Sequence, residues 1–206
     1  MDISDKENTL NFCQEELNKL YIEFIEPVIN GKISTELMYD NEVNKKTIIR
    51  CSLETYNEIK LDNRKVALND SLVYTCTYTC LKLLKQIINK ISKEYNINYL
   101  SLSNKLLYYK NNGYMGWHTN INTPGDRWYL VYNTHDNSSF FRYIDPETNE
   151  MITKWEPKGW SINHFVIGKK DKPLWHCIYT SEIRISIGMK INKLAYNFKF
   201  ENIILN

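Results

Sequence analysis

Two stretches in the first half of the chain space their hydrophobic residues as amphipathic helices do. In residues 7–30 the apolar positions recur every three or four residues, and the pattern ends near Asn30-Gly31. In residues 70–95 the same spacing follows Asp70-Ser71, a typical helix start, whereas residues 32–68 show no clear period. The apolar positions are Leu10, Cys13, Leu17, Leu20, Tyr21, Phe24 and Val28, then Leu72, Cys76, Leu83, Leu84, Ile87, Ile88 and Ile91.

After residue 100 the pattern changes to short β-rich runs between turn residues. Six of the seven glycines lie between 113 and 188, and prolines separate several of the runs. The predicted strands are 105–109, 127–133, 139–144, 151–155, 161–167, 174–180 and 184–191. We therefore expect one α+β, mostly β domain over 1–206. Its core would be a double-stranded β-helix, or jelly roll, over 101–206, with a helical support region over 1–100 packed on one face.

The last predicted strand, 184–191, separates apolar from polar side chains. The apolar positions are Ile185, Ile187, Met189 and Ile191, and they alternate with Arg184, Ser186 and Gly188. If the apolar face packs on the helices, the polar face points into the barrel. An unpaired guanidinium buried there would cost several kcal/mol and would need a ligand. The alternative is a half-exposed strand whose polar face meets water.

Composition adds limits on the class of protein. The net charge of +2 combines −5 in residues 1–60 (7 bases, 12 acids) with +7 in residues 61–206 (19 bases, 12 acids). This bias is compatible with an anionic ligand and is too weak to predict DNA binding. Fifteen tyrosines favour a polar-lined cavity, because buried hydroxyls need partners.

The cysteines and the N-terminus bear on the compartment. Five cysteines without a C-x-x-C pair predict reduced thiols, and Cys76 and Cys80 have helical spacing. The polar N-terminus does not resemble a signal peptide, and no apolar run approaches the roughly 20 residues of a membrane span. We therefore expect a cytoplasmic protein without a membrane partner.

Two of the four histidines, His118 and His176, directly follow a tryptophan. Asn120 stands two residues after the first, and Arg184 stands eight after the second, followed two residues later by Ser186. In order and spacing, this set resembles the Fe(II)/2-oxoglutarate-dependent dioxygenases. Members of that superfamily carry H-x-D/E on an early barrel strand, a distal His on a late strand, and a basic residue beyond it, often as R-x-S. The resemblance covers about residues 105–191.

Two further positions are similar to the prolyl-hydroxylase-like branch of this superfamily. Tyr109 lies nine residues before His118, and Gly113 lies five before it, as in that branch. The compact length and the composition rich in Asn and Lys resemble small members encoded by phages and large viruses, for which the compartment would be the host cytoplasm.

The resemblance implies a set of roles. Fe(II) would be held by His118, Asn120 and His176, and the far carboxylate of 2-oxoglutarate by Arg184, with Ser186 and Tyr109 as further donors. His118, His176 and Arg184 would then be the catalytic residues. The implied reaction uses dioxygen to hydroxylate a substrate and releases succinate and carbon dioxide. Protein and nucleic acid both remain open as substrate classes, as does the oligomeric state.

The chain departs from the family at Asn120, where the pattern asks for a carboxylate. Asn120 would be a weak third ligand, or water, an anion or a loop carboxylate (Asp126, then Asp136) would take its place, or the site would be inactive. We favour an active site with Asn120 in the ligand position. The halogenating branch has a small residue here, so halogenation is a weaker alternative.

The rival from another class is a non-catalytic jelly-roll protein that binds a small acid or a partner chain. Other residues have ordinary explanations. His135 is expected in an exposed turn, His164 in a strand with its hydrogen bonds satisfied, and Cys177 pointing away from the metal by strand alternation. Substrate contacts are expected from residues 32–68 and 134–160, because loops supply them in such folds.

Overall fold

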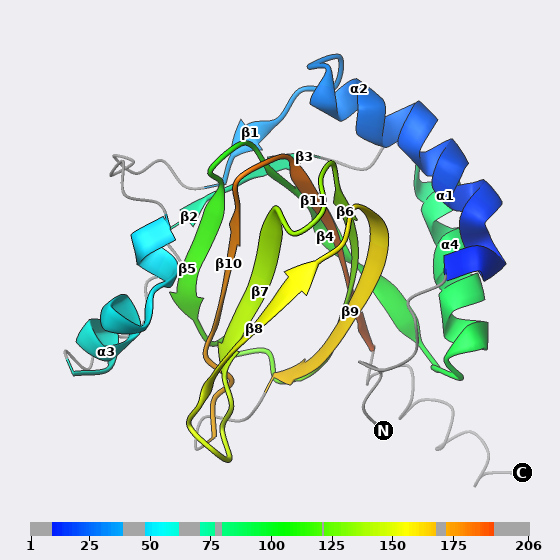
Figure 1. Ribbon diagram of the computed structural model, residues 1–206. Helices are drawn as coiled ribbons and strands as arrows, with labels where there is room; N and C mark the ends of the chain where they lie inside the picture. The colour runs from blue at the N-terminus through cyan, green and yellow to red at the C-terminus, as the bar shows by residue number, and fades with distance from the viewer. Residues whose placement is uncertain are drawn as a thin grey trace, which may run out of the picture.

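Two antiparallel β-sheets face each other at the centre of the molecule (Figure 1). The computed structural model describes residues 10–38, 48–61, 71–76, 80–120, 122–167 and 172–191. The six-stranded sheet runs β1 (Glu36–Leu37), β3 (Tyr74–Cys76), β4 (Leu100–Tyr109), β11 (Arg184–Ile191), β6 (Gly125–Asn133) and β9 (Gly159–Ile167). The five-stranded sheet runs β2 (Ser71–Leu72), β5 (Tyr114–His118), β10 (His176–Thr180), β7 (Ser139–Ile144) and β8 (Met151–Glu156).

The strand order is that of a jelly roll. Strands β4, β11, β6 and β9 are neighbours in one sheet, and β5, β10, β7 and β8 are neighbours in the other. From β4 to β11, consecutive strands therefore alternate between the sheets, except β7 and β8, which pair with each other, and this is the arrangement of a double Greek key. The predicted fold class is confirmed, and each of the seven predicted strands is present, two of them with the predicted bounds. Strand β5 was not predicted, because it is short and contains Gly116, which weakens a strand signal.

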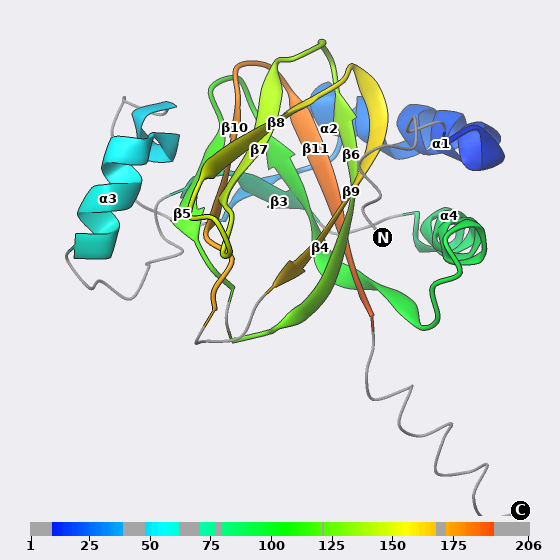
Figure 2. The same ribbon diagram turned by 60° about the horizontal axis from the view of Figure 1, so that its bottom comes forward.

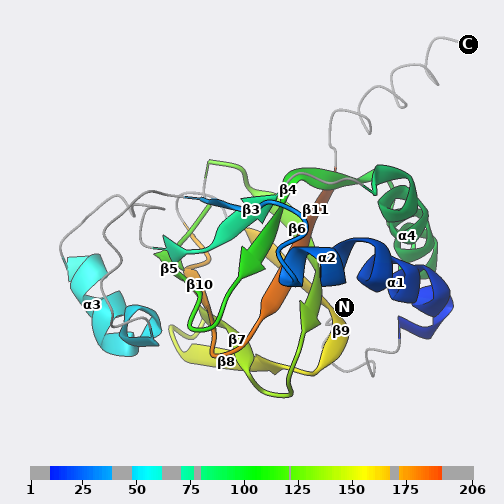
Figure 3. The ribbon, with the colours of Figure 1, turned by 90° about the horizontal axis from the view of Figure 1, so that it is seen from above.

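The N-terminal helices cover the outer face of the six-stranded sheet (Figures 2 and 3). They form one continuous segment of η2 (Leu10–Cys13), α1 (Gln14–Leu20), the π-helical η3 (Tyr21–Ile25) and α2 (Glu26–Ile29). Helix α4 (Leu81–Glu94) packs beside α1. Their apolar faces share one buried cluster with Ile185, Ile187 and Met189 of β11. The predicted first helix is confirmed over the described residues, while residues 7–9 lie outside them.

The predicted helix over 70–95 is wrong in its first part. Residues 71–76 form β2 and β3, and α4 begins only at Leu81. The segment is rich in β-branched and aromatic residues, which favour strands, and β2 and β3 pair with β5 and β4. Cys76 therefore lies in a strand and Cys80 caps α4, so their spacing is not a helical turn.

A smaller helical segment flanks the five-stranded sheet on its outer side (Figure 1). It consists of η4 (Ile48–Cys51) and α3 (Leu53–Leu61), and it packs through Cys51 and Tyr56 on Trp117 and Cys177. Cys177 thus points away from the space between the sheets, as predicted. All five cysteines lie in described segments and are free thiols. None of the helices described here has the length and apolar character needed to cross a lipid bilayer.

Candidate functional site

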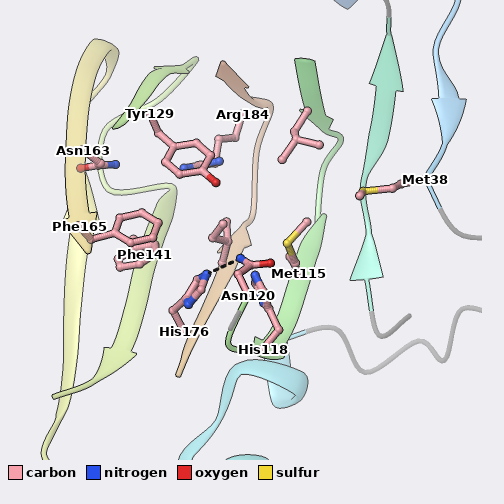
Figure 4. Close-up of a pocket in the computed structure, with 12 residues that line it drawn as sticks. Met38, Met115, His118, Asn120, Tyr129, Phe141, Asn163, Phe165, His176 and Arg184 are labelled. Carbon is pink, nitrogen blue, oxygen red and sulfur yellow. Dashed lines mark hydrogen bonds between the residues drawn. The ribbon is translucent and has the colours of Figure 1, made fainter. Parts of the chain in front are cut away.

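A cavity of about 200 Å³ lies between the two sheets (Figure 4). One end is formed by His118, Asn120 and His176, and Figure 4 shows Arg184 at the opposite end. Between them the walls are mainly apolar, with side chains that include Leu107, Met115, Phe141, Phe165 and Ile178. The cavity is therefore lined by polar side chains at its two ends and by apolar side chains in the middle.

Strand register brings the two histidines together. His118 is the last residue of β5 and His176 the first of β10, and their Cα atoms are direct partners across the antiparallel pair. Side chains opposite each other on neighbouring strands point to the same face of the sheet. The two ring centroids lie 4.1 Å apart, and both residues are buried.

The backbone fixes which nitrogen of each ring faces the cavity. Nδ1 of His118 lies 2.8 Å from the Gly116 carbonyl, and Nδ1 of His176 lies 2.9 Å from the Leu174 carbonyl. Because a carbonyl can only accept, both Nδ1 atoms carry the proton, and each Nε2 is unprotonated and keeps a lone pair. This is the orientation that metal-binding histidines adopt.

Burial also keeps the rings neutral. It lowers the pKa of His118 to about 4, against a smaller opposing effect of the hydrogen bond to Gly116. Burial, followed by the proximity of His118, lowers the pKa of His176 well below its ordinary value. Both imidazoles are therefore neutral at neutral pH, which is the form that binds a metal.

Asn120 lies against the two rings. Its backbone is left-handed, with φ at 51°, a conformation that Asn adopts more readily than most residues. The side-chain Nδ2 is 3.3 Å from Nε2 of His176 (Figure 4). The oxygen and nitrogen of an amide exchange places by a half-turn, so Oδ1 can face the same point. Two imidazole lone pairs and one amide oxygen thus fit a divalent cation, with no charged ligand among them.

Within the described part of the chain, no third His, Cys, Asp or Glu completes a metal-binding cluster. Asp126 binds Nε2 of His164 at 3.0 Å instead, and Asp136 accepts from the backbone N–H of Lys158. The hypothesis of a ligand from either aspartate is therefore wrong. The same contacts confirm that His164 has a partner, and the His135 side chain is 65% exposed as predicted.

At the other end of the cavity, Arg184 is paired with Glu156. Nε and Nη2 of the guanidinium donate to the two carboxylate oxygens at 2.7 and 2.8 Å, and each residue is 2% exposed. Burial alone would raise the pKa of Glu156, but Arg184 and the hydrogen bonds lower it below its ordinary value. Burial would lower the pKa of Arg184, and Glu156 raises it. Both groups are therefore charged.

Two more side chains donate hydrogen bonds to the Glu156 carboxylate. The Ser139 hydroxyl donates to Oε2, and Nδ2 of Asn163 donates to Oε1 at 2.7 Å. The sequence analysis missed Glu156, because the predicted strand ended at Trp155 and because an acidic residue at a strand end is usually exposed. Only the pairing of β8 with β7, which places Glu156 opposite Ser139, shows that it faces inward.

The residues predicted to bind the cosubstrate lie together, but Arg184 is not free. Tyr109 is the Cα partner of Arg184, and its ring centroid is 5.1 Å from the guanidinium carbon. Ser186 follows on the same inward face of β11 and is 1% exposed, so the half-exposed alternative for this strand is wrong. Seven buried side-chain polar atoms of the described residues have no hydrogen-bond partner, and Arg184 Nη1, Tyr109 Oη, Ser186 Oγ and Ser161 Oγ are four of them.

Comparisons with known proteins give only distant similarities. No family model matches the chain, and no curated protein matches it in sequence. An oxidoreductase of the 2OG-Fe(II) oxygenase family from Burkholderia pseudomallei is 10% identical, with a TM-score of 0.43, over 80% of this chain and 87% of its own. A prolyl hydroxylase from Trichoplax adhaerens, solved with a peptide fragment, is 12% identical with a TM-score of 0.41, over 90% and 93%.

A Drosophila melanogaster CENP-C domain is similar to nearly the same degree, at 9% identity and a TM-score of 0.38, over 86% of this chain and 98% of its own. At such identities and TM-scores, the two oxygenase-type proteins and the CENP-C domain match this chain about equally. The function of this chain is therefore argued from its own side chains.

Proposed function

We propose that this protein is a non-haem Fe(II) oxygenase that uses a 2-oxo acid as cosubstrate, most simply a hydroxylase. The observation that carries the proposal is the pair of buried, neutral imidazoles. Both keep Nε2 unprotonated beside the Asn120 amide at one end of the cavity. Arg184 lines the other end, and its Nη1 has no hydrogen-bond partner among the described residues. Two imidazoles plus one oxygen on a single face, with positions left open, suit non-haem iron.

Each residue at the metal end has a role in this proposal. His118 and His176 would hold the cation through Nε2, and the Gly116 and Leu174 carbonyls would keep the rings in place. Asn120 would supply a neutral third oxygen. When bound, the iron supplies activation of dioxygen toward an unreactive C–H bond. Phe141 and Phe165 lie 5.5 and 5.3 Å from the His176 ring and would keep water away from the reacting atoms.

The keto acid would lie along the cavity, with its 2-oxo and carboxylate groups at the metal end. Its far end would reach Nη1 of Arg184, which lines the cavity and has no hydrogen-bond partner among the residues described. The Tyr109 and Ser186 hydroxyls belong to buried residues that adjoin Arg184 without lining the cavity, and they would be further donors at this end. For the cosubstrate that the sequence predicted, 2-oxoglutarate, oxidative decarboxylation would give succinate and carbon dioxide.

The proposal is tested by anaerobic titration of the metal-free protein with Fe(II) and 2-oxo acids, 2-oxoglutarate among them. We expect a visible charge-transfer absorption that needs both components and disappears in the His176→Ala variant. The exposed His135→Ala variant is the matched control and should behave as the wild type. If no 2-oxo acid gives this absorption with iron, the oxygenase function is wrong.

One observation favours the second candidate, a non-catalytic binding protein. The described residues place no carboxylate on the metal side of the cavity. A protein of this kind would bind a small acid equally well with and without the metal. Calorimetric titration in the presence and absence of a divalent cation therefore separates the two functions.

A further inference from the structure

At the Arg184 end of the cavity, the positive charge of Arg184 is already balanced by Glu156. Arg184 is the residue expected to pair with the far carboxylate of 2-oxoglutarate, yet Glu156 occupies two of its nitrogen atoms at 2.7 and 2.8 Å. A second carboxylate at this end would share one guanidinium with Glu156. In a buried site the repulsion between two carboxylates is large, because little water screens it.

Glu156 is not placed to move aside for a ligand. Its two oxygens accept four hydrogen bonds, two from Arg184 and one each from Ser139 and Asn163. The residue is 2% exposed. Displacing its carboxylate would leave a buried charge without a partner, which is costly. The pair therefore persists when a ligand binds.

At the end of the cavity formed by the two histidines and Asn120, no negatively charged side chain in the described part of the chain is available to balance a cation. His118, His176 and Asn120 would bind through imidazole and amide groups that carry no negative charge, and no carboxylate of the described residues joins them, so these side chains offset none of the charge of a divalent cation. A ligand's negative charge is most useful beside these residues. At the Arg184 end, the donor that remains on a cavity-lining residue is Nη1 of Arg184. The hydroxyls of Tyr109 and Ser186, on buried residues beside Arg184, also lack a hydrogen-bond partner among the described residues.

We propose that the cavity selects a 2-oxo acid whose far end is an uncharged carbonyl, and that Glu156 determines this selectivity against the dicarboxylate. A carbonyl oxygen can accept from Nη1 of Arg184 without adding a second negative charge next to Glu156. The inference rests on the proposed function, and it names the class of cosubstrate for the same site.

The test compares two ligands that differ in charge and hardly in shape. The probes are 2-oxoglutarate and 2,5-dioxohexanoate, in which a methyl group replaces one oxygen of the far carboxylate. Binding to the Ni(II)-loaded protein is measured by calorimetry. We expect 2,5-dioxohexanoate to bind roughly tenfold more tightly or better. Equal or tighter binding of 2-oxoglutarate would overturn the inference and leave the oxygenase function standing. If neither binds and other 2-oxo acids fail as well, the proposed function itself fails.

A variant tests the role of Glu156 directly. Glu156→Gln keeps the shape of the side chain and removes its charge, so 2-oxoglutarate should gain roughly tenfold in affinity and lose most or all of its disadvantage against 2,5-dioxohexanoate. The exposed Glu147→Gln variant is the control and should keep the wild-type preference. An unchanged preference in a folded Glu156→Gln variant would contradict the assignment. If that variant does not fold, the ligand comparison in the wild type decides alone.

Discussion

At one end of the cavity two imidazoles and an amide converge without a formal charge; at the other a guanidinium and a carboxylate are buried in contact. The first group has imidazole lone pairs beside the cavity and no charged partner among the described residues. The second has its charges matched within the protein. The difference indicates that the histidine end was shaped for binding, whereas the Arg184 end combines a structural pair with a few free donors.

The comparison gives different expectations for variants at the two ends. Changes at the histidine end should alter metal affinity more than stability, because each ring makes one hydrogen bond to the backbone. Changes to the ion pair should alter stability first, because a single substitution leaves an unmatched charge inside the protein.

The largest effect is expected from breaking the ion pair. Arg184→Met and Glu156→Leu should each lower the free energy of unfolding by about 3–5 kcal/mol. The double variant should lose much less, because neither charge is then left alone. Urea unfolding of the four proteins measures this directly. A double variant that loses the sum of the two single effects would show that the residues act independently.

The next largest effect concerns the pH dependence of the metal-free protein. The pKa of His118 is about 4 in the folded protein and about 6.5 when unfolded. The unfolded chain therefore takes up this proton first, and stability falls as the pH drops from about 6.5 to about 4. The loss from this residue should approach 3 kcal/mol. Unfolding curves across this range measure it, and His118→Leu should flatten the dependence; an equally steep profile in that variant would contradict the assignment.

A charge added at the histidine end should have a smaller effect of opposite sign. Asn120→Asp places a carboxylate beside the two rings and should strengthen divalent metal binding about tenfold, or roughly 1.4 kcal/mol. Asn137→Asp is a matched control, since Asn137 is exposed and has a similar left-handed backbone, with φ at 50° against 51°. Metal titration by calorimetry gives both affinities. If Asn120→Asp gains no affinity, residue 120 is not a ligand of the metal.

The smallest effect is expected at the unpartnered hydroxyl of Tyr109. Tyr109→Phe should weaken binding of the 2-oxo acid by roughly 1 kcal/mol, because one hydrogen bond to the ligand is lost. The ligand-free protein should keep its stability, since the hydroxyl has no partner among the described residues. Tyr108→Phe, on the helix-facing side of the same strand, should leave ligand affinity unchanged. Equal effects of the two substitutions on ligand affinity would show that Tyr109 does not contact the ligand.

Local patterns predicted much of the fold. The alternation along β11 identified both its helix-facing side and its cavity side, because an alternating strand has only two faces. The first helix followed from its three-to-four spacing. The second was extended too far, because Leu72 and Cys76 fit a helical spacing by chance. Pairing with β4 and β5 decides the conformation of that segment.

The sequence by itself determined which groups are available and in what order: two histidines, an amide in the position of a carboxylate, and an arginine on the last strand. Tertiary structure alone decided that Glu156 meets Arg184, because the two lie 28 residues apart on strands of different sheets. Periodicity describes the faces of single strands. Which charges lie together depends on how the strands pair and on which faces of the two sheets meet. Here the histidine end holds groups without charge, whereas the arginine end holds two opposite charges that cancel.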